Sequence, residues 1–170
     1  MNPVPATTLY PLPDADATRA LGRRLAEKLL GEQQAEGSSH LLLLEGSLGA
    51  GKTCLVQGLA EGLGIREPVT SPTFALAHHY QGWANRPTAL VHLDLYRLEQ
   101  PAAADELFAQ EEEEARALSA VLAVEWPERL SGLPEPCWRV QLTFAGGGRV
   151  AVLSGPEWEG PHLFLGPETA

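Results

Sequence analysis

One stretch in the first third of the chain limits its fold more than any other. Residues 46–53 read GSLGAGKT and match the phosphate-loop pattern G-x-x-x-x-G-K-[ST] at every position. Residues 40–45, HLLLLE, precede this loop and predict a short buried strand, whereas the residues after it predict an amphipathic helix. Strand, glycine loop and helix in this order make the pattern specific for a bound polyphosphate.

The residue types of this loop suit the phosphates of a nucleotide. Gly46, Gly49 and Gly51 allow backbone N–H groups to turn toward phosphate oxygens, and the N-terminus of the following helix adds a positive dipole. We expect Lys52 to reach the β- and γ-phosphates and the Thr53 hydroxyl to bind a Mg²⁺ ion that also holds phosphate oxygens. A chance glycine turn is the alternative, and the complete match in this context argues against it.

Length and cysteine content predict a single cytoplasmic domain. The 170 residues are enough for one domain with a core, and no apolar run approaches the ~20 residues that cross a bilayer. The N-terminus lacks the basic and apolar segments of a secretory signal. Cys54 and Cys137 are expected to be reduced thiols, as is usual in the cytoplasm.

The charge balance argues against direct binding to nucleic acid. The formal net charge is −10, and the 12 Lys and Arg residues form no dense cluster. Binding to a nucleic-acid backbone normally needs a basic patch. Any nucleic-acid role is therefore expected to pass through a partner protein.

The order of the predicted elements indicates an α/β protein: a P-loop NTPase-like three-layer fold with a mixed central sheet and a C-terminal β-hairpin. Residues 1–155 are expected to form one domain, and residues 156–170 a Gly/Pro-rich tail that can be mobile. Besides the strand and helix around the loop, we expect an edge strand over 9–13, a helix from Asp14 or Asp16 to about Leu30, a polar loop over 31–39, a hairpin of strands 74–80 and 89–95, a helix over 101–118, a strand over 120–125 and a hairpin of strands 138–144 and 149–153.

Functional side chains alternate along the strand predicted at 89–95. His92, Asp94 and Tyr96 share one face, whereas residues 91, 93 and 95 are apolar and point the other way. A solvent-facing sheet edge explains this pattern, and so does a strand that lines the nucleotide site. In the second case Asp94 would hold a Mg²⁺-bound water or orient the attacking water.

A buried strand ending in an acid is predicted at residues 120–125. The apolar run AVLAV is followed by Glu125, and the strand is broken by Pro127. P-loop proteins present a carboxylate beside Mg²⁺ at such a strand end. That carboxylate is usually Asp, and here it is Glu125.

Three further segments can each be interpreted either as an ordinary structural feature or as part of a functional site. Residues 67–74, EPVTSPTF, are either a switch that senses the γ-phosphate or a plain surface turn. The acidic run at 111–114 is interpreted as a solvated helix face, with docking of a basic partner as the alternative. His78 and His79 are adjacent in a predicted strand and point to opposite faces, so no metal site is expected from this pair.

Together these motifs resemble the TsaE (YjeE) family of small bacterial P-loop ATPases in the tRNA threonylcarbamoyladenosine pathway. The resemblance covers roughly residues 11–130 and rests on the combination and order of its motifs. These are PLPD at 11–14 followed by Ala17-Thr18, the loop at 46–53, SPTF at 71–74, HLDLYR at 92–97 and VEWP at 124–127.

The resemblance implies binding and slow hydrolysis of ATP with Mg²⁺, stimulated by partners. It also implies work alongside a TsaD–TsaB protein pair, which transfers threonylcarbamoyl to the tRNA adenosine next to the anticodon. The ATPase would be needed for turnover without doing the transfer, and would meet tRNA only through the pair. By position, Lys52, Asp94 and Glu125 would be catalytic and Thr53 and Glu125 would bind Mg²⁺. The phosphate-binding residues would be Gly46, Gly49, Ala50, Gly51, Lys52, Thr53 and Cys54.

The chain departs from the family pattern in three places, and two other functions stay open. Cys54 replaces a usual Thr or Ser, residues 108–110 lead into glutamates where the family has a Gly-containing segment, and the tail has no clear match. A small-molecule kinase would grip its acceptor with His92, Asp94 and Arg97, but it should carry an Arg-rich lid. A nucleotide-gated binding module would hydrolyse negligible ATP.

Overall fold

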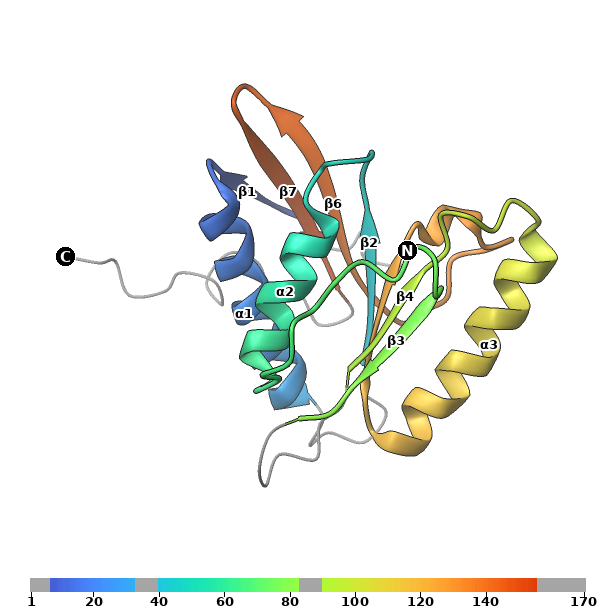
Figure 1. The fold of residues 1–170 in the computed structure, drawn as a ribbon. Coiled ribbons are helices and arrows are strands. Elements are labelled where there is room, and N and C mark those ends of the chain that lie inside the picture. The colour runs from blue at the N-terminus through green and yellow to red at the C-terminus, as the bar shows by residue number, and fades with distance from the viewer. Residues whose placement is uncertain (1–6, 33–39, 83–89, 156–170) are drawn as a thin grey trace, which may run out of the picture.

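The computed structural model describes residues 7–32, 40–82 and 90–155 as a three-layer α/β fold. A seven-stranded mixed sheet has the order β1-β7-β6-β2-β5-β4-β3. Helices α1 and α2 cover one face and α3 covers the other (Figure 1), which confirms the predicted fold class. The elements are β1 (Thr8–Leu12), α1 (Ala15–Glu32), β2 (Leu41–Glu45), α2 (Lys52–Gly62), β3 (Ala77–Tyr80), β4 (Leu90–Asp94), α3 (Pro101–Leu118), β5 (Val121–Glu125), a 3₁₀ turn (Pro127–Arg129), β6 (Trp138–Ala145) and β7 (Gly148–Ser154).

The centre of the sheet is parallel and its two edges are antiparallel. Strand β2 lies between β5 and β6 and is parallel to both, and β4 is parallel to β5. The predicted hairpins are present as antiparallel pairs, β3 with β4 and β6 with β7. Strand β1 pairs with β7 at one edge, as its proline-containing sequence predicts. The carboxyl ends of the parallel strands β2, β4 and β5 therefore lie side by side at the same end of the sheet, which is where ligands bind in open α/β sheets.

The leucine run of β2 joins the two cores. Leu42 and Leu44 belong to the core under α1 and α2, whereas Leu41 and Leu43 belong to the core under α3. A central parallel strand is buried on both faces, so it needs a continuous apolar run rather than alternation. Among the described helices, none has the length and apolar content to cross a bilayer.

The structure corrects the start of the third strand. Strand β3 begins at Ala77, not at Phe74, because residues 73–75 form a turn. The Leu76 N–H donates to the Pro72 carbonyl at 2.6 Å, and Leu76 has a left-handed φ of 69°. The Leu76 carbonyl then accepts the Asp94 N–H at 2.9 Å, which fixes this turn at the end of β4.

Other sequence boundaries hold with small changes. Helix α1 continues through Gly31 to Glu32, so the predicted loop begins later than expected, and its remaining residues 33–39 lie outside the described ones. Residues 83–88 of the loop predicted at 81–88 and the whole tail at 156–170 also lie outside the described residues. Asp14 accepts the Ala17 N–H on Oδ1 at 2.8 Å and so caps α1.

The interpretation of the acidic run as a solvated face is wrong for its first residue. Glu111 is only 6% exposed. Its Oε2 atom lies 2.7 Å from Nε2 of His79 on β3. A buried carboxylate needs a polar partner, and His79 on the edge strand β3 supplies one to this residue of α3.

The α1–α2 packing depends on glycine, which gives a first testable prediction. A Cβ atom at Gly58 would lie 2.0 Å from the Arg19 carbonyl oxygen, so the two backbones touch there. We expect Gly58→Ala to lower the free energy of unfolding by about 1–3 kcal/mol through overpacking. Urea denaturation of the full chain measures it as a lower midpoint with an unchanged slope.

Gly31→Ala is the matched control for Gly58→Ala. A Cβ at Gly31, also in a helix, would meet nothing within 4 Å. Alanine is the better helix former, so the control should be neutral or more stable by up to about 1 kcal/mol. Equal midpoints for the two variants would contradict a glycine-dependent helix crossing.

Candidate functional site

The phosphate loop adopts the conformation that its glycines permit. It connects the carboxyl end of β2 to the first residue of α2, Lys52. Gly49 and Gly51 have φ angles of 77° and 106°, in the left-handed region that favours glycine. The first turn of α2 therefore follows directly on the loop, and residues 48–54 line the adjoining cavity.

Lys52 is held at the mouth of this loop. Its Nζ atom donates hydrogen bonds to the carbonyl of Gly46 and, at 3.1 Å, to that of Ser47. The same atom lies 4.1 Å from the centroid of the Trp126 ring. Burial lowers the pKa of Lys52, and the carboxylates of Glu125, Glu128 and Asp94 partly oppose this shift. The ammonium group is thus poorly solvated and suited to pair with a bound anion.

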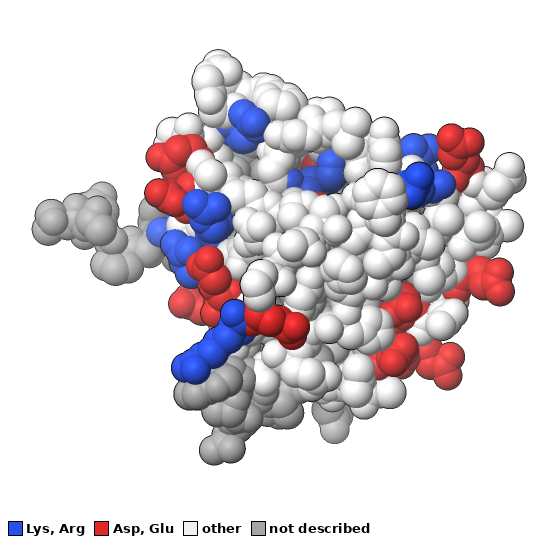
Figure 2. All heavy atoms as spheres, in the orientation of Figure 1, with Lys and Arg blue, Asp and Glu red and all other residues white. Residues whose placement is uncertain are grey.

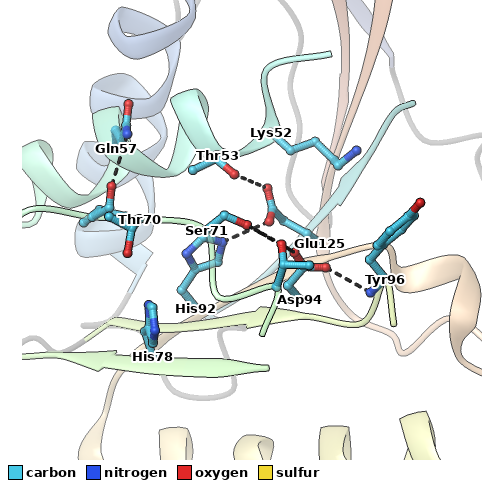
Figure 3. A network of polar contacts seen from close by, with 12 residues as sticks. Lys52, Thr53, Gln57, Thr70, Ser71, His78, His92, Asp94, Tyr96 and Glu125 are labelled. Carbon is cyan, nitrogen blue, oxygen red and sulfur yellow. Dashed lines mark hydrogen bonds and ion pairs between the residues drawn. The ribbon is translucent and has the colours of Figure 1, made fainter. Parts of the chain in front are cut away.

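Thr53 and Glu125 are brought together although they are 72 residues apart. Thr53 Oγ1 donates to Glu125 Oε1 at 3.1 Å (Figure 3). Thr53 lies in the first turn of α2, and Glu125 ends β5, the strand beside β2. A hydroxyl and a 2% exposed carboxylate form an oxygen donor pair of the kind that Mg²⁺ prefers. The residues predicted as metal ligands therefore fit that ion.

Asp94 connects the end of β4 to the loop before β3. Its Oδ2 atom accepts hydrogen bonds from Thr73 Oγ1 at 2.9 Å and Ser71 Oγ at 3.4 Å. Its Oδ1 atom accepts the Tyr96 N–H at 2.9 Å. Asp94 is 3% exposed and pairs in register with Glu125. These contacts exclude a plain surface turn for Ser71 and Thr73 and join this loop to the candidate site.

Strand β4 is buried along its whole length, which decides between the two interpretations of its alternating pattern. All five residues are buried, and β3 and β5 flank the strand on either side. The polar face therefore lines the site rather than a solvent-facing edge. Its first polar residue, His92, is fully buried, with Nε2 3.3 Å from Glu125 Oε2.

His92 is a site residue for which the sequence analysis predicted no role in ATP hydrolysis. Neither ring nitrogen makes a well-aligned hydrogen bond within the described part of the chain. Its imidazole instead supports the carboxylate of Glu125 from below, as Figure 3 shows. Its shared face with Asp94 was the available signal, but the contact itself depends on the β4–β5 register.

Two adjoining cavities surround the loop. One has a volume of about 270 Å³ and is lined by Leu48, Gly49, Ala50, Gly51, Lys52, Thr53, Cys54, Ser71, Thr73, Asp94, Tyr96, Glu125 and Trp126. Its lining includes every predicted site residue except Gly46, the first residue of the loop, whose carbonyl accepts a hydrogen bond from Lys52. The second cavity, about 340 Å³, shares Ala50, Gly51 and Cys54 and reaches the start of α1 and the tip of the β6–β7 hairpin.

Cys54 lies between the two cavities as a free thiol. Burial raises its pKa, and the Arg19 guanidinium partly offsets this shift. The thiol donates to the Ala15 carbonyl at 3.5 Å and lies 3.7 Å from Arg19 Nη1. The departure from Thr or Ser therefore leaves a neutral side chain here, and the Cys54 backbone remains in the first turn of α2.

Comparisons with known proteins identify the family of this chain. The family model described as "Threonylcarbamoyl adenosine biosynthesis protein TsaE" matches residues 12–150. The chain is 42% identical to the tRNA threonylcarbamoyladenosine biosynthesis protein TsaE of a Nostoc species over 137 residues, covering 81% of this chain and 78% of that protein. The protein of the same name from Haemophilus influenzae is 33% identical over 139 residues, covering 81% and 83%.

A solved structure supports the fold independently. The crystal structure of Bacillus subtilis YdiB superposes with a TM-score of 0.61 at 23% identity, covering 89% of this chain and 87% of that one. The match of fold, of most of the sequence and of the family model gives one conclusion: the chain belongs to the TsaE family.

Proposed function

We propose that this protein binds and slowly hydrolyses ATP with Mg²⁺ and supports threonylcarbamoylation of the tRNA adenosine next to the anticodon. It would do so by acting on a TsaD–TsaB type complex and not by performing the transfer. The names of its relatives support the pathway. The observation that carries the chemistry is the Thr53–Glu125 pair beside Lys52 at the phosphate loop.

The chain's own residues divide the work of phosphoryl transfer to water. The loop N–H groups and Lys52 would bind the phosphates and stabilise charge that develops during transfer. Thr53 and Glu125 would hold Mg²⁺, which supplies charge neutralisation at the phosphate oxygens. Asp94, the carboxylate that lines this cavity beside Glu125, would orient the attacking water.

The loop that contains Ser71 and Thr73 is suited to report on the γ-phosphate. Both hydroxyls donate to the same carboxylate oxygen, Asp94 Oδ2, and both residues line the cavity of about 270 Å³, which would be the phosphate cavity. A nucleotide that draws Asp94 toward a water or metal ligand would compete with these hydrogen bonds. The state of the bound nucleotide would thereby reach the surface, where the adjacent Phe74 is 84% exposed.

The nucleoside would occupy the second cavity. That cavity joins the phosphate cavity through Ala50, Gly51 and Cys54. Its far wall contains Arg149, whose guanidinium donates to the Gly49 carbonyl at 3.1 Å and so ties the hairpin to the loop. A volume of about 340 Å³ lies in the range of small-molecule sites.

The lowered pKa of Lys52 gives a pH prediction. Phosphate contact would raise this pKa again, so binding takes up a proton in the window between the free and bound values. Affinity should be fully present at pH values below the lowered pKa and should fall as the pH rises through it. Nucleotide titrations from about pH 7 to about 10.5 measure this, an ordinary lysine having a pKa near 10.4. A Lys52→Met chain should lack this dependence, and an identical profile in both chains would contradict it.

Single-turnover hydrolysis of γ-labelled ATP tests the proposed function. With Mg²⁺ the chain should release labelled phosphate slowly, faster with the TsaD–TsaB pair, and not at all with EDTA. Stimulation by a small metabolite, with label in a phosphorylated product, would instead indicate a kinase. Tight ATP binding without release, even with the pair, would indicate a nucleotide-gated binding module.

A further inference from the structure

A second group of metal-binding side chains lies across the outer edge of the sheet. His79 on β3 faces α3, and Glu111 and Glu114 project toward it from successive turns of that helix. Residues three apart on a helix are neighbours on one face, so a single imidazole reaches both carboxylates. Neither the candidate nucleotide site nor the family motifs include these residues.

The three side chains are close enough to share one ion. His79 Nε2 lies 2.7 Å from Glu111 Oε2, and Nδ1 lies 3.8 Å from Glu114 Oε1. One ligand atom from each residue falls within 4.8 Å of the others. The Glu114 side chain is 49% exposed and can turn toward Nε2, whereas Glu111 is fixed by burial.

The local charge favours a cation. A buried carboxylate is costly unless it is paired, and the group that faces Glu111 Oε2 is the His79 imidazole, at 2.7 Å. Helix α3 has a single base, Arg116, and that base pairs with Glu112 at 3.0 Å. Figure 2 shows acidic side chains gathered over α3. The group therefore keeps excess negative charge next to a nitrogen ligand.

We propose that His79, Glu111 and Glu114 form a binding site for a divalent metal ion such as Zn²⁺, which accepts both nitrogen and oxygen ligands. The donor set of one imidazole and two carboxylates is one that Zn²⁺ accepts, whereas Mg²⁺ and Ca²⁺ prefer oxygen alone. The ion would take the place of the hydrogen bond between His79 Nε2 and Glu111 Oε2, with the proton of that bond moving to Nδ1 or to solvent, and Glu114 completes a three-residue set. His79 is 33% exposed, which leaves room for a water ligand.

Such an ion would fix α3 to the strand that follows the Asp94 loop. Strand β3 starts directly after the turn whose Leu76 carbonyl binds the Asp94 N–H. Glu114 and Glu111 would therefore restrain this edge of the site through His79. The metal site stands independently of the proposed ATPase activity, because its test uses no nucleotide.

Zinc titration of the full chain against a chromophoric chelator tests the site, with excess Mg²⁺ present to compete at Thr53 and Glu125. Two variants in the glutamate run 111–114 are compared, each of which removes one negative charge. Glu114→Gln removes a proposed ligand, whereas Glu113→Gln removes a charge outside the proposed site. Loss of a ligand should weaken the site at least about tenfold, the lower end of what ligand-shell changes cost. Glu113→Gln should change affinity less than about twofold.

A second readout identifies the histidine. The NMR signals of the two imidazoles are assigned by their absence from the spectra of His79→Asn and His78→Asn chains. On addition of Zn²⁺ to the parent chain, the His79 signals should shift and the His78 signals should not. Equal affinities of the Glu114→Gln and parent chains, or unchanged His79 signals, would overturn the metal site. The group would then be only a hydrogen-bonded connection between β3 and α3.

Discussion

Replacing Lys52 by alanine is expected to lower the rate of ATP hydrolysis by about 10²–10³-fold, the typical effect of removing one preorganised hydrogen-bond donor to the charge that develops in the transition state. Lys52 is the basic residue that lines the phosphate cavity, and it is 6% exposed, so water replaces its ammonium group poorly. ATP affinity should fall as well, because the lysine would also contact the phosphates of bound ATP before the reaction. Single-turnover hydrolysis at saturating ATP and binding of a fluorescent ATP analogue separate the two effects.

The fold should survive the Lys52→Ala change. Burial already disfavours the charged form of this lysine, and its hydrogen bonds go to loop carbonyls rather than to a core partner. The thermal midpoint of the variant should therefore stay close to that of the parent. A variant that is folded and hydrolyses ATP within about threefold of the parent rate would remove Lys52 from the mechanism.

Glu125→Gln is expected to raise the Mg²⁺ concentration needed for half-maximal hydrolysis at least about tenfold, comparable to or greater than the cost of perturbing a metal's ligand shell. The substitution keeps the shape of the side chain and an oxygen for the Thr53 hydroxyl, but it removes the charge beside the metal position. Hydrolysis measured over a Mg²⁺ titration gives the shift, and the rate at saturating Mg²⁺ shows any further loss.

Glu45→Gln is the matched control for this change. Glu45 ends the neighbouring strand β2, as Glu125 ends β5, and it binds Arg139 at 2.6 Å and Gln141 at 2.7 Å instead of lining the cavity. Its Mg²⁺ dependence should match that of the parent. Parallel shifts in both variants would indicate a general charge effect and would contradict a ligand role for Glu125.

The sequence predicted those parts of the site that local patterns encode. The conformation of the loop at 46–53 could be predicted from its sequence alone, because its glycines, lysine and threonine lie within eight consecutive residues. The acid at the end of an apolar run predicted Glu125, and alternation predicted the polar face of His92 and Asp94. The contact between Thr53 and Glu125 follows from these, because strand order in a P-loop fold brings the two ends together.

Contacts set by register and by helix rotation were beyond local patterns. The Thr73–Asp94 hydrogen bond required the left-handed turn at Leu76, which no strand-forming pattern indicates. The burial of Glu111 required the packing of α3 against an edge strand, and in sequence it looks like its three neighbouring glutamates. His79 is separated from it by 32 residues, so only the folded chain shows the pair.

We propose that a nucleotide cycle at Lys52, Thr53 and Glu125 supports tRNA modification by a partner complex. The most direct measurement is the number of threonylcarbamoyladenosines formed per TsaD–TsaB complex when the parent or the Lys52→Ala chain is added with ATP and Mg²⁺. We expect repeated rounds of modification with the parent chain and no continued turnover with the variant. Equal yields from the parent and a folded Lys52→Ala chain would contradict it.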